Sequence, residues 1–232
     1  MSKTVVIHQP DFLPYLGFFH RFLLADLWVV LDDAQFLTGG SKSWHNRDKI
    51  KTPQGERWLT VGVKKTPLDT MINEAFLADD GWEKKNLNLL AENYRKAPFF
   101  NEVFPAVERL YAHDCVKLID FNMRSIEMLM EMLDIRIKTI FASTLKALGK
   151  KTERLVDICK KVEATTYLTG VGSRDYLQES LFETEGMKVV WQDFKHPVYP
   201  QLHGEFVPYL SGVDILFNCG IKKSREIIRS LT

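Results

Sequence analysis

Residues 4–33 read TVVIHQPDFLPYLGFFHRFLLADLWVVLDD, and this stretch decides the fold class. The β-branched run from Thr4 to Ile7 ends at Pro10, and Pro14 to Ala25 then carries apolar side chains at helical spacing. Leu27 to Leu31 is continuously apolar, which is typical of a strand buried on both faces of a parallel sheet. The segment therefore predicts a strand, a helix and a second, parallel strand.

A different pattern interrupts this alternation in the middle of the chain. Charged and aromatic residues from Trp44 to Lys64 surround a turn sequence and predict a β-hairpin, with Arg57 to Val63 as its second strand. Gly81 to Lys96 and Glu102 to Leu133 have amphipathic spacing and predict helical regions. Because uncapped helices longer than about 25 residues are unusual, we expect the second region to break near His113 and Asp114.

The alternation then resumes, and the pattern predicts a single α/β domain over residues 1–232. We expect a mainly parallel sheet flanked by helices (Rossmann-like), with the hairpin and helical segment inserted at about residues 40–133. The remaining predicted strands are Ile137 to Ala142, Thr165 to Thr169 and Val189 to Trp191, and the remaining predicted helices are Thr152 to Val162, Tyr209 to Phe217 and Lys222 to Leu231.

The composition argues against two classes of partner. The 232 residues include 31 Lys and Arg against 30 Asp and Glu, so the formal charge of +1 provides no field that would draw the chain onto nucleic acid. The longest apolar stretches fall short of the roughly 20 residues that cross a bilayer. The N-terminus lacks the features of a signal peptide. We expect a cytoplasmic protein with a small-molecule substrate, no nucleic-acid partner and no membrane insertion; the sequence predicts neither a cofactor nor an oligomeric state.

The cysteines and histidines show no metal-site spacing. Cys115, Cys159 and Cys219 lack any C-x-x-C pairing, which favours reduced thiols over disulfides or structural zinc. Cys219 lies in a polar motif and is either a nucleophile or, as is more common, a small buried residue. His196 and His203 could ligate zinc or iron, but hydrogen-bonded loop anchors are the favoured interpretation. We therefore predict no metal site and no metal requirement for folding.

Polar residues follow the first two predicted strands, where α/β sheets bind ligands. His8, Gln9 and Asp11 follow the first strand, and Asp32, Asp33 and Gln35 follow the second. His8 is either a general base or a structural residue of the turn. Asp33 and its neighbour Asp32 could hold a metal, bind a ribose or orient a basic side chain, and one of them is expected to cap a turn or helix. We assign His8 and Asp33 as catalytic and Gln9 and Gln35 as substrate-binding.

Two further segments combine groups that bind anions. Trp44, Asn46, Arg47 and Lys49 gather aromatic, amide and cationic side chains, which suits a phosphate or carboxylate beside a stacked ring; the alternative is a solvated strand edge. Residues 169–176, TGVGSRDY, follow a strand and enter a helix, where backbone amides can cradle an anion, although two glycines are weak evidence. The candidate binding residues of this second segment are Gly170, Ser173 and Arg174.

Motifs along nearly the whole chain resemble the WbqC-like family. The resemblance rests on IHQPDFLPYLGFF at residues 7–19, W-x-N-R-x-K-I at 44–50, YLTG at 167–170 and F-x-P-x-L-S-x-x-D-x-L-x-N-x-G at 206–220. It implies a bacterial protein associated with the assembly of surface sugars such as O-antigen, and no particular reaction or substrate. From these motifs and their polar loop we add, as substrate-binding residues, Tyr15, Tyr199, Gln201, Asp214 and Asn218.

We therefore expect a transferase of surface-polysaccharide (O-antigen) or amino-sugar biosynthesis, acting on a sugar or nucleotide-linked sugar. One alternative is a nucleotidyltransferase-like enzyme that lacks the usual H-x-G-H motif, because the corresponding stretch reads Tyr15-Leu16-Gly17-Phe18. Another is a non-catalytic assembly partner of a glycosyltransferase complex.

Overall fold

The computed structural model describes residues 2–37, 43–112 and 114–232. Its centre is a five-stranded, fully parallel sheet with the order β5-β2-β1-β6-β7. The predicted Rossmann-like α/β class is confirmed, and the strands that we expected from Thr4 to Ile7, Leu27 to Leu31, Ile137 to Ala142 and Thr165 to Thr169 lie in this one sheet. The strands are β1 (Thr4–His8), β2 (Leu27–Val30), β5 (Lys138–Phe141), β6 (Thr166–Thr169) and β7 (Lys188–Trp191).

The central strands are apolar throughout because the sheet is buried on both faces. Side chains of adjacent residues point to opposite faces, so Val6 and Trp28 join one hydrophobic core while Val5 and Val29 join the other. All four are at most 1% exposed. At about 25 cal/mol per Å² of apolar area, burial on this scale explains why residues 5–7 of β1 and all of β2 are apolar.

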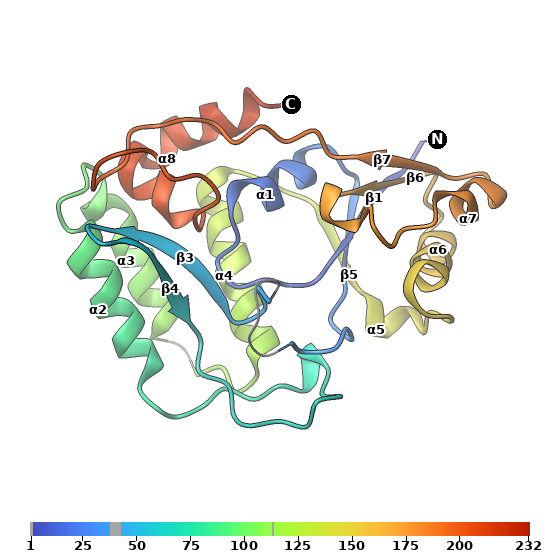
Figure 1. Cartoon of the computed structure of the whole chain (residues 1–232), viewed down its shortest axis with the longest axis horizontal. Coiled ribbons are helices and arrows are strands. Elements are labelled where there is room, and N and C mark those ends of the chain that lie inside the picture. Colours follow the sequence, from blue (N-terminus) through green and yellow to red (C-terminus); the bar gives the residue numbers. More distant parts are fainter. Residues whose placement is uncertain (1, 38–42, 113) are drawn as a thin grey trace.

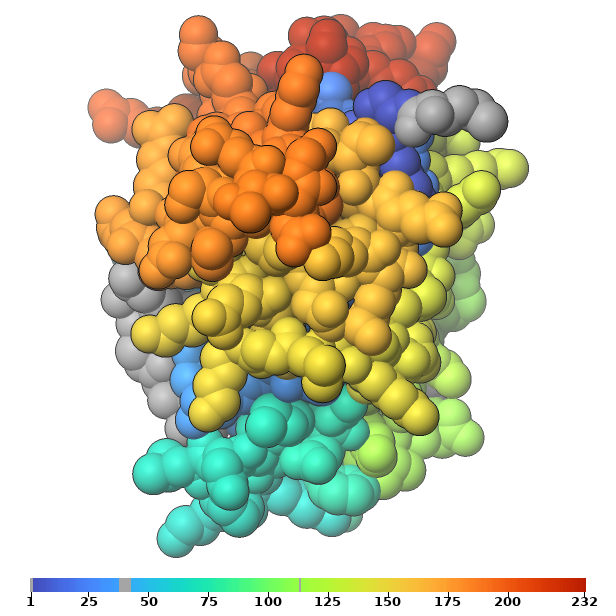
Figure 2. Space-filling model, turned by 90° about the vertical axis from the view of Figure 1, so that its right-hand side faces the viewer, coloured from blue at the N-terminus to red at the C-terminus, as the bar shows by residue number. Residues whose placement is uncertain are grey.

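Helices cover both faces of the sheet (Figure 1). The larger core collects α1 to α4 and α8, whereas the smaller core lies under α5 to α7, whose segment covers the sheet in the view of Figure 2. The helices are α1 (Leu16–Leu23), α2 (Trp82–Tyr94), α3 (Phe100–Tyr111), α4 (Leu118–Leu133), α5 (Ala142–Leu145), α6 (Lys151–Lys161), α7 (Glu179–Thr184) and α8 (Val213–Arg229), with short 3₁₀ turns η1 (Ile72–Glu74) and η2 (Val171–Ser173).

The segment between β2 and β5 forms the hairpin and helices that the sequence predicts. Strands β3 (Arg47–Thr52) and β4 (Gly55–Thr60) pair antiparallel and lie against α2 (Figure 1). The second strand ends at Thr60 and not at Val63, as expected from the sequence, because residues 61–63 turn away to contact the segment around Leu77. Helices α3 and α4 are separate, and His113, where we expected the break, lies outside the described residues.

The C-terminal helix is divided where the sequence predicts. We expected two helical segments, at 209–217 and 222–231, and α8 (Val213–Arg229) consists of two helices joined across a kink at Gly220; its first turn begins at Val213 and not at Tyr209. Gly220 has φ +75°, and a Cβ there would lie 2.5 Å from the Phe99 ring. Glycine meets both constraints because it has no side chain, and the two halves of α8 can then pack on α3 and α4.

We expect Gly220→Ala to destabilise the fold by about 2–4 kcal/mol, because it combines left-handed backbone strain with an overpacked contact. Gly186→Ala is the matched control: Gly186 has φ +71° but no atom within 4 Å of a Cβ, so it should cost only about 1 kcal/mol. Urea unfolding of both variants measures the difference. Equal costs would show that the Phe99 contact imposes no constraint.

Candidate functional site

The strand order places a topological switch point between β1 and β6. From β1 the chain builds outward through β2 and β5 on one side, and through β6 and β7 on the other. In such sheets the crossovers diverge beyond the carboxyl ends of the two central strands and leave a crevice there. His8 is the last residue of β1, and Gly170 follows the last residue of β6. Both sequence-predicted residues therefore lie at the switch point.

His8 and Asp11 form the titratable centre of this region. The His8 Nδ1 lies 2.9 Å from the carbonyl oxygen of Gln9 and 3.7 Å from Asp11 Oδ2. Burial, together with the positive charge of Arg21, lowers the pKa of His8 to about 3, although the Gln9 carbonyl opposes the shift. Burial raises the pKa of Asp11 to about 7, with Arg21 opposing it. At neutral pH the contact is therefore not an ion pair: His8 is neutral and Asp11 is near its titration midpoint.

Residues of the hairpin and of the α1 region lie close enough to this pair to interact with it electrostatically. Asp48, at the start of the hairpin, is 2% exposed, and burial raises its pKa well above the usual range, with a further increase from Asp11. Its Oδ1 accepts a 2.6 Å hydrogen bond from the backbone N–H of Lys49. Burial also raises the pKa of Tyr15, which precedes α1. We call the group His8, Asp11, Tyr15, Arg21 and Asp48 the switch-point cluster.

Three cluster members were not among the residues to which we assigned a role from the sequence. Asp11 was a candidate, because it follows the first strand just after His8 and Gln9. Asp48 carried a weaker signal, since it lies between Arg47 and Lys49, which match the family motif. Arg21 carried none, because a basic residue in the last turn of a helix normally faces solvent.

The acidic residues that follow β2 are engaged elsewhere. Asp33 pairs with Arg154 of α6, although its Oδ1 is buried without a hydrogen-bond partner among the described residues. Asp32 accepts hydrogen bonds from Ser143 and from Asn73 Nδ2, the latter at 3.0 Å. Gln35 Nε2 donates to the carbonyl oxygen of Leu68 at 2.6 Å. These contacts attach neighbouring segments to the end of β2.

The hairpin residues form a stack of cations and rings. The Arg47 guanidinium carbon lies 4.3 Å from the centre of the Trp58 ring, and Lys49 Nζ lies 5.2 Å from it. Trp44 packs against the same ring with centroids 5.5 Å apart. Asn46 donates from Nδ2 to the carbonyl oxygen of Val61 at 3.0 Å. The aromatic and cationic groups therefore lie together as predicted. The charged groups of Arg47 and Lys49 are positioned over the Trp58 ring.

The loop after β6 divides into two parts. Gly170 lies at the switch point, where a Cβ would be 3.8 Å from Arg21 Nη1. Ser173 instead accepts a 2.9 Å hydrogen bond from the Tyr176 hydroxyl, and the Arg174 guanidinium lies 5.3 Å from the Trp191 ring centre. Gly170 is the residue of this loop that contacts the cluster.

The four C-terminal candidates form a closed hydrogen-bond network. Asp214, fully buried, accepts from Tyr94 at 2.7 Å and from Tyr199 and Gln201 at 2.9 Å. Burial raises the pKa of Asp214, although these three hydrogen bonds oppose the shift. Asn218 donates to the carbonyl oxygen of Asp214 at 2.7 Å. The network fastens the 199–208 loop to α8, and its polar groups satisfy one another.

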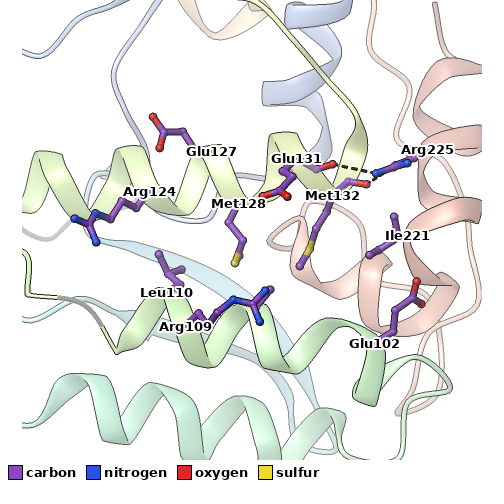
Figure 3. A pocket seen from close by; sticks show the side chains of 11 residues that line it. Glu102, Arg109, Leu110, Arg124, Glu127, Met128, Glu131, Met132, Ile221 and Arg225 are labelled. Atoms are coloured by element: carbon purple, nitrogen blue, oxygen red, sulfur yellow. Dashed lines mark hydrogen bonds between the residues drawn. The ribbon is translucent and has the colours of Figure 1, made fainter.

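Two grooves lie elsewhere on the surface. One, of about 460 Å³, runs between α3, α4 and α8, where Arg109, Leu110 and Met128 project between facing helices (Figure 3). The other, of about 850 Å³, includes Asp32 and Cys115 in its lining. Within the described residues, no three His, Cys, Asp or Glu side chains are grouped to hold a metal ion. No described helix is long and apolar enough to span a membrane.

The comparison with known families agrees with the motif resemblance. The model of the WbqC-like protein family matches residues 9–226. The chain belongs to this family. It is also 31% identical over 221 residues to the uncharacterized protein Rv1507c of Mycobacterium tuberculosis (strain ATCC 25618 / H37Rv), an alignment that covers 94% of each chain. No solved structure matches the chain.

The shifted pKa of Asp11 predicts a pH-dependent stability. The folded-state pKa of Asp11, about 7, exceeds the usual 3.8. The stabilisation of the folded state by Asp11 is therefore fully present below about pH 4 and is lost as the pH rises through 7. Asp11→Asn, which cannot ionise, should gain about 1–3 kcal/mol over wild type between pH 4 and pH 8. Urea unfolding at pH 4, 6 and 8 measures this gain, and a difference that stays constant with pH would contradict it.

The buried network predicts a purely structural effect. Asp214→Asn places an amide nitrogen against donor groups, and it should destabilise the fold by about 2–4 kcal/mol. Asp134→Asn is the control: Asp134 pairs with Arg229 on the surface, where solvent screens the charges, so the substitution should cost much less stability. Denaturation curves compare the two. A loss at Asp214 as small as that at Asp134 would argue against the network as the anchor of the loop.

Proposed function

We propose that this WbqC-like protein is a group-transfer enzyme of bacterial surface-polysaccharide or amino-sugar biosynthesis, with its reaction centre at the switch-point cluster. The observation that carries the proposal is the contact between His8 and Asp11, two titratable side chains whose pKa values move in opposite directions. Groups tuned in this way at a ligand crevice are typical of acid–base catalysis. The link to surface sugars rests on family resemblance alone.

Asp11 is the proposed general base. With a pKa of about 7, its carboxylate can accept a proton from a hydroxyl or amino group of the acceptor substrate. The freed lone pair of that oxygen or nitrogen forms the bond to the transferred group. The bond to the leaving group breaks, and the leaving group keeps the electron pair. The proton then passes from Asp11 to the leaving group or to water, which restores the carboxylate.

His8 and Asp48 have supporting roles in this proposal. His8 is neutral at the working pH, so its ring can hold a substrate hydroxyl by a hydrogen bond without competing for the proton. Burial, with a further increase from Asp11, raises the pKa of Asp48, which favours the protonated form that donates a hydrogen bond. From the sequence we assigned Asp33 as a catalytic residue. Because Asp33 pairs with Arg154, we propose Asp11 as the base in its place.

The first experiment identifies the substrate. The purified protein is incubated with a bacterial metabolite extract, and bound compounds are recovered and identified by mass spectrometry. A sugar, sugar phosphate or nucleotide-linked sugar supports the proposal. Capture of a free nucleoside triphosphate, by binding that depends on His8, would instead favour nucleotidyl transfer. Saturable binding with no turnover in the presence of acceptors would favour the non-catalytic assembly partner.

The proposal then predicts the kinetic effects of two acidic residues. Asp11→Asn should lower kcat at least about 100-fold with little change in substrate affinity, because only proton transfer is lost. In wild type, kcat/KM should rise with pH through about 7 as Asp11 ionises. Asp33→Asn is the matched comparison and should reduce stability more than turnover. Loss of turnover in a folded Asp33→Asn protein, with Asp11→Asn still active, would return the base role to Asp33.

A further inference from the structure

Arg21 is a buried cation that has no hydrogen-bonding or ionic partner for its guanidinium among the described residues. Its side chain belongs to a residue that is only 5% exposed, and its Nε has no hydrogen-bond partner. Among residues 2–37, 43–112 and 114–232, no hydrogen bond or ion pair engages its guanidinium, and its one ring contact places the guanidinium carbon 5.7 Å from the centre of Phe18. By contrast, Arg154 pairs with Asp33. An unpaired buried charge is costly, so its presence calls for a partner that the chain does not supply.

The guanidinium lies at the carboxyl end of the central strands. Its Nη1 is the atom nearest to a Cβ built on Gly170, at 3.8 Å. Its charge acts on His8 and Asp11, and burial lowers its own pKa while Tyr15 opposes that shift. Arg21 and Asp11 influence each other in this way but form no ion pair, which leaves the guanidinium available to a ligand.

Gly170 keeps the approach to this guanidinium open. Its backbone, with φ −80° and ψ 154°, is ordinary extended structure that any residue can adopt, so the backbone does not require glycine. A Cβ would meet nothing closer than ordinary van der Waals contact, with Arg21 at 3.8 Å and Gln192 Oε1 at 3.9 Å. A methyl group at this position would therefore be tolerated by the protein, but would occupy the space beside Arg21.

We propose that Arg21 binds an oxyanion of the substrate, a phosphate or carboxylate group, in the space beside Gly170 at the switch point. The planar guanidinium can hold two oxygens of such a group through parallel hydrogen bonds. The assignment of this oxyanion to the substrate rests on the proposed function; the binding of the oxyanion does not. In this proposal the buried residue that binds the anion is Arg21 and not Arg47 of the hairpin.

The test measures anion binding in the full-length protein. Inorganic phosphate and, separately, acetate are titrated at constant ionic strength maintained with chloride, with calorimetry and thermal unfolding as readouts. Wild type should bind at least one of the two and gain thermal stability. Tighter binding of phosphate or of acetate then identifies the group as phosphate or carboxylate.

Three variants locate the site. Arg21→Met should weaken binding at least tenfold and should raise the Tm in anion-free buffer, because it removes an unpaired buried charge. Gly170→Ala should remain folded and bind at least threefold more weakly. Gly172→Ala is the control, since no atom lies within 4 Å of a Cβ at Gly172, and its affinity should stay within twofold of wild type.

The following results would overturn the inference. It fails if wild type binds neither anion more tightly than chloride, or if Arg21→Met binds as well as wild type. If Arg21→Met does not fold, Gly170→Ala decides, and unchanged affinity in that variant refutes the site. Asp11→Asn separates this inference from the proposed function. If wild type and Asp11→Asn both bind phosphate or acetate but neither shows measurable turnover, the anion site stands and the group-transfer assignment is removed.

Discussion

Burial of the parallel sheet on both faces is the constraint on which the rest of the structure depends. With helices packed on each side, β1 and β2 have no solvated face on which to carry polar side chains. Chemistry is therefore confined to the strand ends, where the backbone leaves the sheet. The same burial that excludes water from the core extends to the first residues beyond β1, and it shifts the pKa values of His8 and Asp11 in opposite directions.

The sequence was sufficient for features that depend on local pattern and insufficient for those that depend on packing. The strands showed clearly because continuous apolar runs have one common explanation. His8 and Gly170 could be placed together because parallel strands end at the same edge. Arg21 could not, because its burial arises when the distant C-terminal part of the chain covers α1: Gln192 bonds to the carbonyl oxygen of Gly17, and the carbonyl oxygen of Leu231 bonds to His20.

The buried network around Asp214 and the switch-point cluster differ in one physical respect. Around Asp214, the donor groups of Tyr94, Tyr199 and Gln201 point at one carboxylate and are satisfied by it. In the switch-point cluster, the carboxyl groups and the guanidinium lie close enough to perturb one another without pairing. A satisfied network stabilises a fold, whereas an unsatisfied one reduces its stability and retains binding capacity. That contrast distinguishes a structural anchor from a binding site more reliably than residue type does.

The position of β5 in the sheet has a consequence for how the chain folds. Leu27 of β2 pairs with Lys138 of β5, and Thr4 of β1 pairs with Thr166 of β6, so both neighbours of the central pair are made long after it. Such non-local pairing gives a high contact order and slow folding. During synthesis, the apolar β1 and β2 strands emerge from the ribosome with their outer edges unpaired until more than half of the chain has followed. The nascent protein is then exposed to aggregation, and the rate of translation through the inserted hairpin and helices sets how long that exposure lasts.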